Sequence, residues 1–299
     1  MKPVTRTFYA DAVQRVIERI VTHLDDALDL ATLAGEACLS PFHFHRVFRG
    51  MVGETPLELI RRVRMERAAW RLVHDGGAIT GIAFDAGYDT HEAFTRAFRE
   101  CYSTSPTGFR HRKHPRIELA ASCGVHFDAG GAVPAFVPRD SGGRSMDVEI
   151  TNIPNLRVAA VRHVGPYNQI PVAFERLGAI AGPAGLFRQP GAEGIAIYYD
   201  DPESTAQDRL RSDAGVVVPD GVPLPPGLTE QRIPAGRYAR TRHVGPYEQL
   251  GDAWARFMGE WLPNSGHRLG PGTSYEIYRN DARTTPKAQL ITDMYISIA

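Results

Sequence analysis

Long apolar runs are missing from this chain of 299 residues. No stretch approaches the roughly eighteen consecutive apolar residues that a membrane-spanning helix needs. The N-terminus, "MKPVTRTFYADAVQRV", also has no apolar segment of the kind that a signal peptide requires. We therefore expect a cytoplasmic protein with no membrane partner.

Cysteine is scarce, and the three residues Cys38, Cys101 and Cys123 show no CxxC spacing. This pattern favours reduced thiols over disulfides or a zinc site. Common enzyme motifs are missing too: we find no GxSxG, no HExxH and no phosphate-binding glycine loop. The pair His43-x-His45 does not suggest a metal site, because residues two apart on a helix diverge. The sequence thus predicts no catalytic residues, no metal and no cofactor.

The net charge is zero, but it is divided unevenly along the chain. Residues 1–116 contain 17 Lys and Arg against 14 Asp and Glu, whereas the remainder contains 17 against 20. A polyanion would therefore bind more readily to the first part of the chain.

The stretch "LSPFHFHRVFRGMVGETP" has the pattern of an amphipathic helix. Ser40 is a good N-cap, Pro41 suits the first helical position, and Gly53 provides a stop. One face should be buried and carries Phe44, Val47, Phe48 and Met51. The opposite face carries Phe42, His45, Arg46 and Arg49.

A second helix with the same pattern follows fifty residues later, in "YDTHEAFTRAFRECYSTSP". Thr90 is its N-cap, and its exposed face carries His91, Glu92, Thr95, Arg96 and Arg99. A shift of fifty residues superimposes Phe44 on Phe94 and Arg46 on Arg96. Each helix is preceded by a shorter one, and "LELIRRVRMERAAWRLVHDG" joins the two pairs. This arrangement predicts an all-α domain with two helix-turn-helix motifs.

The pattern "IxxIAFDAGYxxxxxFTRAFR…SPTGFR" resembles the AraC/XylS family of bacterial transcription regulators, over roughly Asp11 to His114. We therefore expect residues 1–114 to form an AraC-type DNA-binding domain. One departure is Ser103, where the family usually has the glycine that ends the second recognition helix.

The resemblance implies that both recognition helices enter successive major grooves of double-stranded DNA, about 34 Å apart. Carried over by position, the residues facing bases are Phe42, His45, Arg46, His91, Glu92, Thr95 and Arg96. Those better placed for phosphates are His43, Arg49 and Arg99. The alternative for these side chains is an ordinary solvated helix surface.

Periodicity lapses over residues 115–145, where "HFDAGGAVPAFVPRDSGGRS" is rich in Gly, Pro and Ala. We interpret this segment as a linker between domains, with a short strand near Gly124–Phe127.

The hexapeptide "RHVGPY" occurs twice, 80 positions apart, and belongs to a longer repeat. Between residues 153–219 and 233–299, 21 of 67 positions are identical without a gap. Each copy reads as β-α-β-β, with another strand before it. The sequence thus predicts an α+β domain of two pseudo-symmetric repeats, about 148–219 and 228–299, with a groove between them.

The paired "HVGPY" turns and the "YEIYRND" strand resemble the GyrI-like effector-binding domain, here residues 146–299, in the Rob-type arrangement that follows an AraC-type domain. The family uses an acid on this strand to bind lipophilic cations. The resemblance therefore implies that Glu276 is the main ligand residue. The duplicated arginines and histidines, by contrast, should serve the shared fold.

The two repeats differ at this position, because Ala196 is the counterpart of Glu276. Strand alternation places Glu276 and Tyr278 on one face. Candidate lining residues are Trp254, Tyr167 and Tyr247, since a carboxylate among aromatic rings can bind an organic cation. The alternative for Glu276 is an exposed carboxylate paired with Arg279.

These patterns together predict a non-enzymatic, ligand-responsive transcription regulator. Its partners would be double-stranded DNA, a small lipophilic or cationic effector such as a drug or toxin, and RNA polymerase. Two alternatives stay open: a GyrI-like hydrolase of small molecules, in which Glu276 activates water, and a protein that sequesters a drug or toxin.

Overall fold

The structure is a computed structural model, and it describes residues 2–139, 146–200 and 205–299. The chain forms two compact units, and each is described by itself. The described residues of Met1–Phe8, Pro41–Arg46 and Ser141–Ala299 form one unit, and those of Tyr9–Ser40 and Val47–Asp140 form the other. Among the described residues, no helix has both the length and the apolar character needed to cross a membrane.

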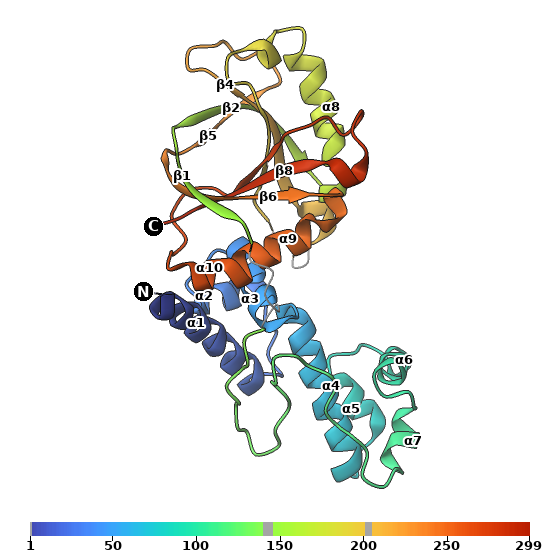
Figure 1. Cartoon of the computed structure of the whole chain (residues 1–299). Coiled ribbons are helices and arrows are strands. Elements are labelled where there is room, and N and C mark those ends of the chain that lie inside the picture. The colour runs from blue at the N-terminus through green and yellow to red at the C-terminus, as the bar shows by residue number, and fades with distance from the viewer. Residues whose placement is uncertain (1, 140–145, 201–204) are drawn as a thin grey trace. The chain divides into compact units, whose positions relative to one another are not determined.

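The N-terminal part of the chain is helical (Figure 1). Its helices are α1 (Lys2–Thr22), α2 (Leu30–Glu36), α3 (Pro41–Val52), α4 (Pro56–His74), α5 (Ile79–Asp85), α6 (His91–Tyr102) and α7 (Pro106–Arg110). The pairs α2–α3 and α5–α6 are the two predicted helix-turn-helix motifs, and α4 joins them. This arrangement confirms the all-α prediction.

Local sequence signals explain where these helices begin and end. The Thr55 side chain accepts from the Glu58 amide while the Glu58 carboxylate accepts from the Thr55 amide, which is a capping box for α4. Thr90 caps α6, as predicted. Gly53 follows α3 with φ +87°, and Ser103 follows α6 with φ 52°. Ser103 therefore adopts the left-handed conformation for which glycine is usually chosen.

The second helix-turn-helix motif has its own aromatic core. Phe94 and Phe98 of α6 are fully buried and pack with Phe109 of α7 and Leu72 of α4. The Phe98 and Phe109 rings meet edge to face at 5.2 Å. The amphipathic pattern of α6 thus has its apolar face in this core, as the sequence predicted.

The short strand expected near Gly124–Phe127 is not formed, because described residues 115–139 contain neither helix nor strand. Residues 140–145 of the expected linker lie outside the described part of the chain.

The C-terminal domain is built on one eight-stranded antiparallel sheet. Its strands are β1 (Val148–Ile153), β2 (Leu156–Val164), β3 (Gly194–Tyr198), β4 (Arg211–Val218), β5 (Thr229–Ile233), β6 (Gly236–Val244), β7 (Tyr275–Tyr278) and β8 (Ile291–Ser297). The order is β1-β6-β8-β7-β3-β4-β2-β5. The predicted α+β class and the repeated β-α-β-β unit are confirmed.

The helices of the two repeats differ in shape. In the first repeat, α8 (Ile170–Ala181) packs against β2 and β4 (Figure 1). In the second, α9 (Leu250–Arg256) continues through a π-helical turn (Phe257–Trp261) into α10 (Leu262–Ser265).

The first strand of each repeat pairs with the other repeat. Strand β1 pairs with β6 of the second copy, and β5 pairs with β2 of the first copy. This exchange was not predicted, because pairing partners cannot be read from strand patterns that are nearly the same in both copies.

The two repeats meet where β3 pairs with β7. In this pairing Ala196 lies directly opposite Glu276, and Ile195 lies opposite Ile277. Since Glu276 is the counterpart of Ala196 in the repeat, the pseudo-two-fold axis passes between these two residues. Both are buried, with 0% of Ala196 and 2% of Glu276 exposed.

The duplicated hexapeptide has a structural role in both copies. Arg162 donates two hydrogen bonds to Asp213, and Arg242 donates two to Asp293, with both aspartates almost fully buried. A histidine ring nitrogen of each turn lies 3.1 or 3.3 Å from the carbonyl oxygen of its proline. The prediction that the duplicated arginines and histidines serve the shared fold is thus confirmed.

The glycine of each turn is required by backbone conformation. Gly165 has φ +139° and Gly245 has φ +146°. Their amides donate to the carbonyls of Leu210 and Leu290, at 2.8 and 2.9 Å. A side chain would strain both turns in the same way.

A carboxylate introduced opposite Glu276 should destabilise the sheet through charge repulsion. We expect Ala196→Glu to lower the free energy of unfolding by about 2 kcal/mol more than Ala196→Gln, which adds the same volume without the charge. Urea unfolding at neutral pH would measure the difference, which should shrink in acid as one carboxyl takes up a proton. Equal stabilities of the two variants would contradict the prediction.

Candidate ligand site and nucleic-acid interface

Glu276 lies at the centre of the C-terminal sheet, on β7. Its carboxylate accepts a hydrogen bond of 2.6 Å from the indole nitrogen of Trp254 on α9 and one of 2.8 Å from the hydroxyl of Tyr278. Both donors are neutral, so neither hydrogen bond cancels the charge that Glu276 carries when it is ionised. The strand holds Glu276 and Tyr278 on one face, as alternation predicted.

Burial dominates the electrostatics of this carboxyl. It raises the pKa of Glu276, and the hydrogen bonds from Trp254 and Tyr278, together with the positive charge of Arg46, only partly oppose this effect. Burial likewise raises the pKa of Tyr278 and of Tyr198 well above 10. Both phenols therefore stay neutral near neutral pH and remain able to donate hydrogen bonds.

The alternative in which Glu276 pairs with Arg279 is wrong. Arg279 donates to Asp293 at 2.7 Å and forms an ion pair with Glu193. Because side chains alternate along β7, Arg279 lies on the opposite face of the sheet from Glu276.

Aromatic rings surround Glu276 and connect all of its predicted neighbours. The Tyr278 hydroxyl lies 2.9 Å from that of Tyr198, its counterpart in the first repeat. The Tyr278 ring packs edge to face against Phe174 at 5.6 Å and in a tilted arrangement against Tyr247 at 5.2 Å. Tyr167 joins through its contact with Tyr198, at 4.7 Å. We call Glu276, Trp254, Tyr278, Tyr198, Tyr247, Phe174 and Tyr167 the axial site.

Sequence reasoning missed Tyr198 as a site residue. A signal was present, because Tyr198 and Tyr278 are identical residues at equivalent positions of the repeat. The two "GPY" tyrosines, although equivalent in sequence, differ in environment. Tyr167 donates to the carbonyl of Asp200 at 2.5 Å, which anchors its turn, while Tyr247 packs on Tyr278 beside the carboxylate.

The axial site is closed, since only 2% of Glu276 is exposed. A ligand could therefore reach the carboxylate only after a covering side chain moves. The site combines a carboxyl group with aromatic rings and hydroxyl groups around it, and this combination suits an organic cation.

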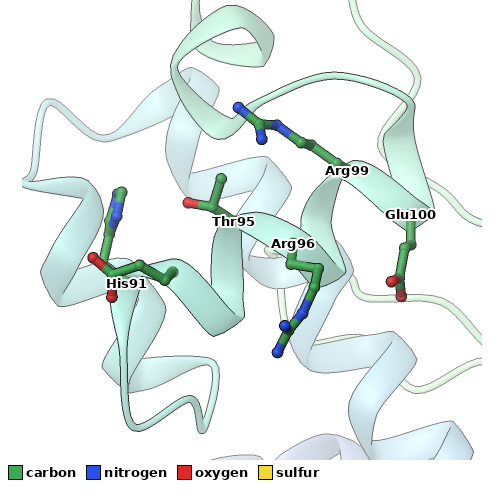
Figure 2. A pocket seen from close by; sticks show the side chains of 6 residues that line it. His91, Thr95, Arg96, Arg99 and Glu100 are labelled. Atoms are coloured by element: carbon green, nitrogen blue, oxygen red, sulfur yellow. The ribbon is translucent and has the colours of Figure 1, made fainter.

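The outward face of α6 carries the second set of predicted DNA contacts. His91, Glu92, Thr95, Arg96 and Arg99 line one surface pocket together with Glu100. Figure 2 shows the labelled side chains projecting from the helix. His91, Glu92, Arg96 and Arg99 are exposed, so they are free to meet a nucleic acid.

The predicted contacts on α3 are less accessible than those on α6. Phe42 and His45 are buried, while His43, Arg46 and Arg49 are partly exposed. The Arg46 guanidinium lies 3.8 Å from the centre of the Phe42 ring, one helical turn away. Base contacts from Phe42 or His45 would therefore require these side chains to become exposed.

Among the described residues, no cluster of three or more His, Cys, Asp or Glu side chains is arranged to hold a metal ion.

The raised pKa of Glu276 should make stability depend on pH. Above 4.5, the usual value for glutamate, the unfolded chain loses a proton that folded Glu276 still keeps. The contribution of this group to stability therefore falls as the pH rises through the window between the two pKa values. The free energy of unfolding of the wild type minus that of Glu276→Gln should decline across this window, as measured by urea denaturation. Parallel pH curves would contradict the shift.

Comparisons with known proteins agree with this two-part organisation. The profile of the GyrI-like small molecule binding domain matches residues 146–299, and that of a helix-turn-helix domain matches residues 33–112. A DNA gyrase inhibitor of Yersinia enterocolitica is 34% identical over 132 residues, which is 42% of this chain and 82% of that protein. Regulatory protein SoxS of Salmonella typhimurium is 34% identical over 100 residues, which is 33% of this chain and 94% of that protein.

Among solved structures, the crystal structure of the EcmrR C-terminal domain matches with a TM-score of 0.43 and 20% identity, covering 52% of this chain and 98% of that one. The profile matches and the relatives show that the chain belongs to the GyrI-like small molecule binding family, and that it is a DNA-binding regulator carrying an AraC-type helix-turn-helix domain ahead of that domain.

Proposed function

We propose that the chain is a sequence-specific transcription regulator whose axial site binds a lipophilic organic cation. The observation that carries the proposal is Glu276, a buried carboxyl whose hydrogen bonds come from the neutral Trp254 and Tyr278, with the charge of Arg46 acting on it from a greater distance. A buried ionised carboxylate with no cation bonded to it is costly, and a bound cation would offset that cost.

Aromatic side chains select the kind of cation. A small hydrated ion would gain little from the rings of Trp254, Tyr247 and Phe174, whereas an aromatic or alkylated cation gains dispersion and cation–π interactions from them. The ligand class that this site favours therefore has a delocalised or shielded positive charge. Several drugs and toxins have this character, so a sensor of such compounds is the biological role we propose.

Ligand entry provides a link to regulation. Because Glu276 is covered, binding requires a rearrangement of the axial site, and a ligand that favours one arrangement can shift the population of the other. The output would be altered DNA binding or altered contact with RNA polymerase, in the cytoplasm. On the DNA side, the groups that would read bases are the exposed Arg96, His91 and Glu92 and the half-buried Thr95.

Hydrolysis of a reactive small molecule is a second candidate function. The observation in its favour is the raised pKa of Glu276 beside the Tyr278 hydroxyl, because a carboxyl tuned in this way can act as a general acid or base. Incubating the protein with candidate electrophiles and following product formation would distinguish it. Turnover that is lost in Glu276→Gln would establish an enzyme in place of the sensor that we propose.

Removal of the charge should separate cation binding from binding by shape. We expect Glu276→Gln to weaken binding of tetraphenylphosphonium roughly tenfold to a hundredfold, and that of neutral triphenylphosphine oxide by less than about threefold. Calorimetry on the full chain would measure both affinities. Glu248→Gln, which changes an exposed carboxylate next to Tyr247, is the control and should behave as wild type. Equal losses for the two ligands would refute an electrostatic role of Glu276.

The DNA-binding half of the proposal has its own test. On operators found by genome-wide mapping, Arg46→Ala and Arg96→Ala together should reduce affinity at least roughly tenfold and relax sequence preference, since bidentate contacts to guanine discriminate bases. Arg99→Ala is the control on the same helix, and it should weaken binding about equally on all sequences. If the folded double variant retained full specificity in fluorescence anisotropy, these arginines would not read bases.

A further inference from the structure

The segment after the second helix-turn-helix motif is bound along the helical unit, although its composition predicted a linker. We call residues 117–139 the strap. Over its first part, alternate side chains turn inward: Ile117 and Leu119 are partly buried, and Cys123 and Val125 are fully buried. Ile117 and Leu119 pack against the core of the second motif. The strap thus buries alternate side chains as a β-strand does, but it turns at residues 122–123, where Gly124 follows with φ 69°, and it lies against helices.

One carboxylate of α4 holds the strap. Glu66 is fully buried, and it accepts hydrogen bonds from the amides of Leu119 and Phe127, both at 2.9 Å. The ring of His126 lies 2.9 Å from the same carboxylate. These contacts supply partners for backbone groups that a strand neighbour would otherwise satisfy.

Arg62, one turn earlier on α4, completes this attachment. It donates to Glu66 at 3.1 Å and to the carbonyl of Val125 at 2.8 Å. Its other nitrogens form a two-point ion pair with Glu54, at 3.0 and 2.7 Å. Glu54 lies in the turn between α3 and α4, so the network joins that turn, the middle of α4 and the strap.

The strap also reaches the C-terminal ends of both recognition helices. At α6, the Tyr102 hydroxyl donates to the carbonyl of Ile117 at 2.6 Å. At α3, the amide of Arg139 donates to the carbonyl of Met51 at 2.7 Å, and the Ser122 hydroxyl donates to that of Val52 at 3.3 Å. The strap therefore ties the end of one recognition helix to the end of the other, across α4.

We infer that the strap is a working part of the DNA-binding unit and that Glu66 is a positioning residue, which holds the two recognition helices at the separation and angle needed for two successive major grooves. Helix α4 has 19 residues and so spans about 28 Å. The second motif already packs against Leu72 of α4, and the strap adds a further connection between the C-terminal ends of the two recognition helices.

A fixed geometry matters because the two motifs act as linked binding modules. When one motif is bound, the second meets its half-site at an effective concentration that depends on how well the connection presents it. A loosened strap should therefore weaken binding to a two-half-site operator and leave each half-site alone unaffected.

The test measures affinity of the full chain on three duplexes recovered from operators of the wild type: the intact site, and the same site with either half-site scrambled. We expect Glu66→Gln to weaken binding to the intact site about tenfold and to change binding to each single half-site by less than about twofold. Hydrogen exchange at the Leu119 and Phe127 amides should accelerate in the same variant, which would confirm that the strap has loosened.

Two further variants keep the inference falsifiable. Tyr102→Phe removes only the hydroxyl that binds Ile117, and it should give a smaller loss of the same kind if Glu66→Gln does not fold. Glu118→Gln changes an exposed carboxylate of the strap and should match the wild type. The inference is overturned by an equal loss on intact and single half-sites, by no loss on any duplex, or by a wild type that gains nothing from the second half-site.

Discussion

The pairing of β3 with β7 about the pseudo-two-fold axis is the constraint on which the C-terminal domain depends. It joins the two repeats into one sheet, and it places each residue near the axis opposite its own counterpart, as Ala196 and Glu276 show. Two glutamates at this position would face each other across a buried strand pair, where like charges are destabilising. A second carboxylate at this position would therefore destabilise the domain.

Around the axis, some residues are identical in the two repeats and others differ between them. Some features occur in both copies and support the fold. They are the buried aspartates that accept hydrogen bonds from Arg162 and Arg242, and the positive-φ glycines of the turns. The residues in contact with Glu276 mix shared and altered positions. Tyr278 has an identical partner in Tyr198, whereas Trp254 replaces Phe174 and supplies an indole donor that phenylalanine lacks.

Much of this organisation could be predicted from sequence, and the exceptions have physical reasons. The helix-turn-helix pairs and the repeat depend on local periodicity and on identity at a fixed shift, which a single chain displays. The exchange of β1 and β5 between repeats depends on long-range pairing, which strand patterns do not encode. The burial of Glu276 follows from the aromatic side chains that pack over the sheet. Alternation along β7 predicted the face of the sheet on which Glu276 lies, but it could not predict that other side chains cover it. The sequence did not predict that the strap is bound to the helices. Its alternating burial, from Ile117 to Val125, resembles that of an unpaired strand, and its hydrogen-bond partners are a glutamate and an arginine on a helix far away in the sequence.

The exchanged strands also bear on how such a domain can arise. One repeat alone would leave β2 without β5 and β6 without β1, so a half-length ancestor would need a second copy of itself to complete its sheet. In such a symmetric dimer, both copies would place the same residue on the axis. A single acidic group at that position therefore becomes possible only when the two copies are fused and can diverge in sequence. Covalent fusion is thus what allows a symmetric sheet to contain an asymmetric binding site.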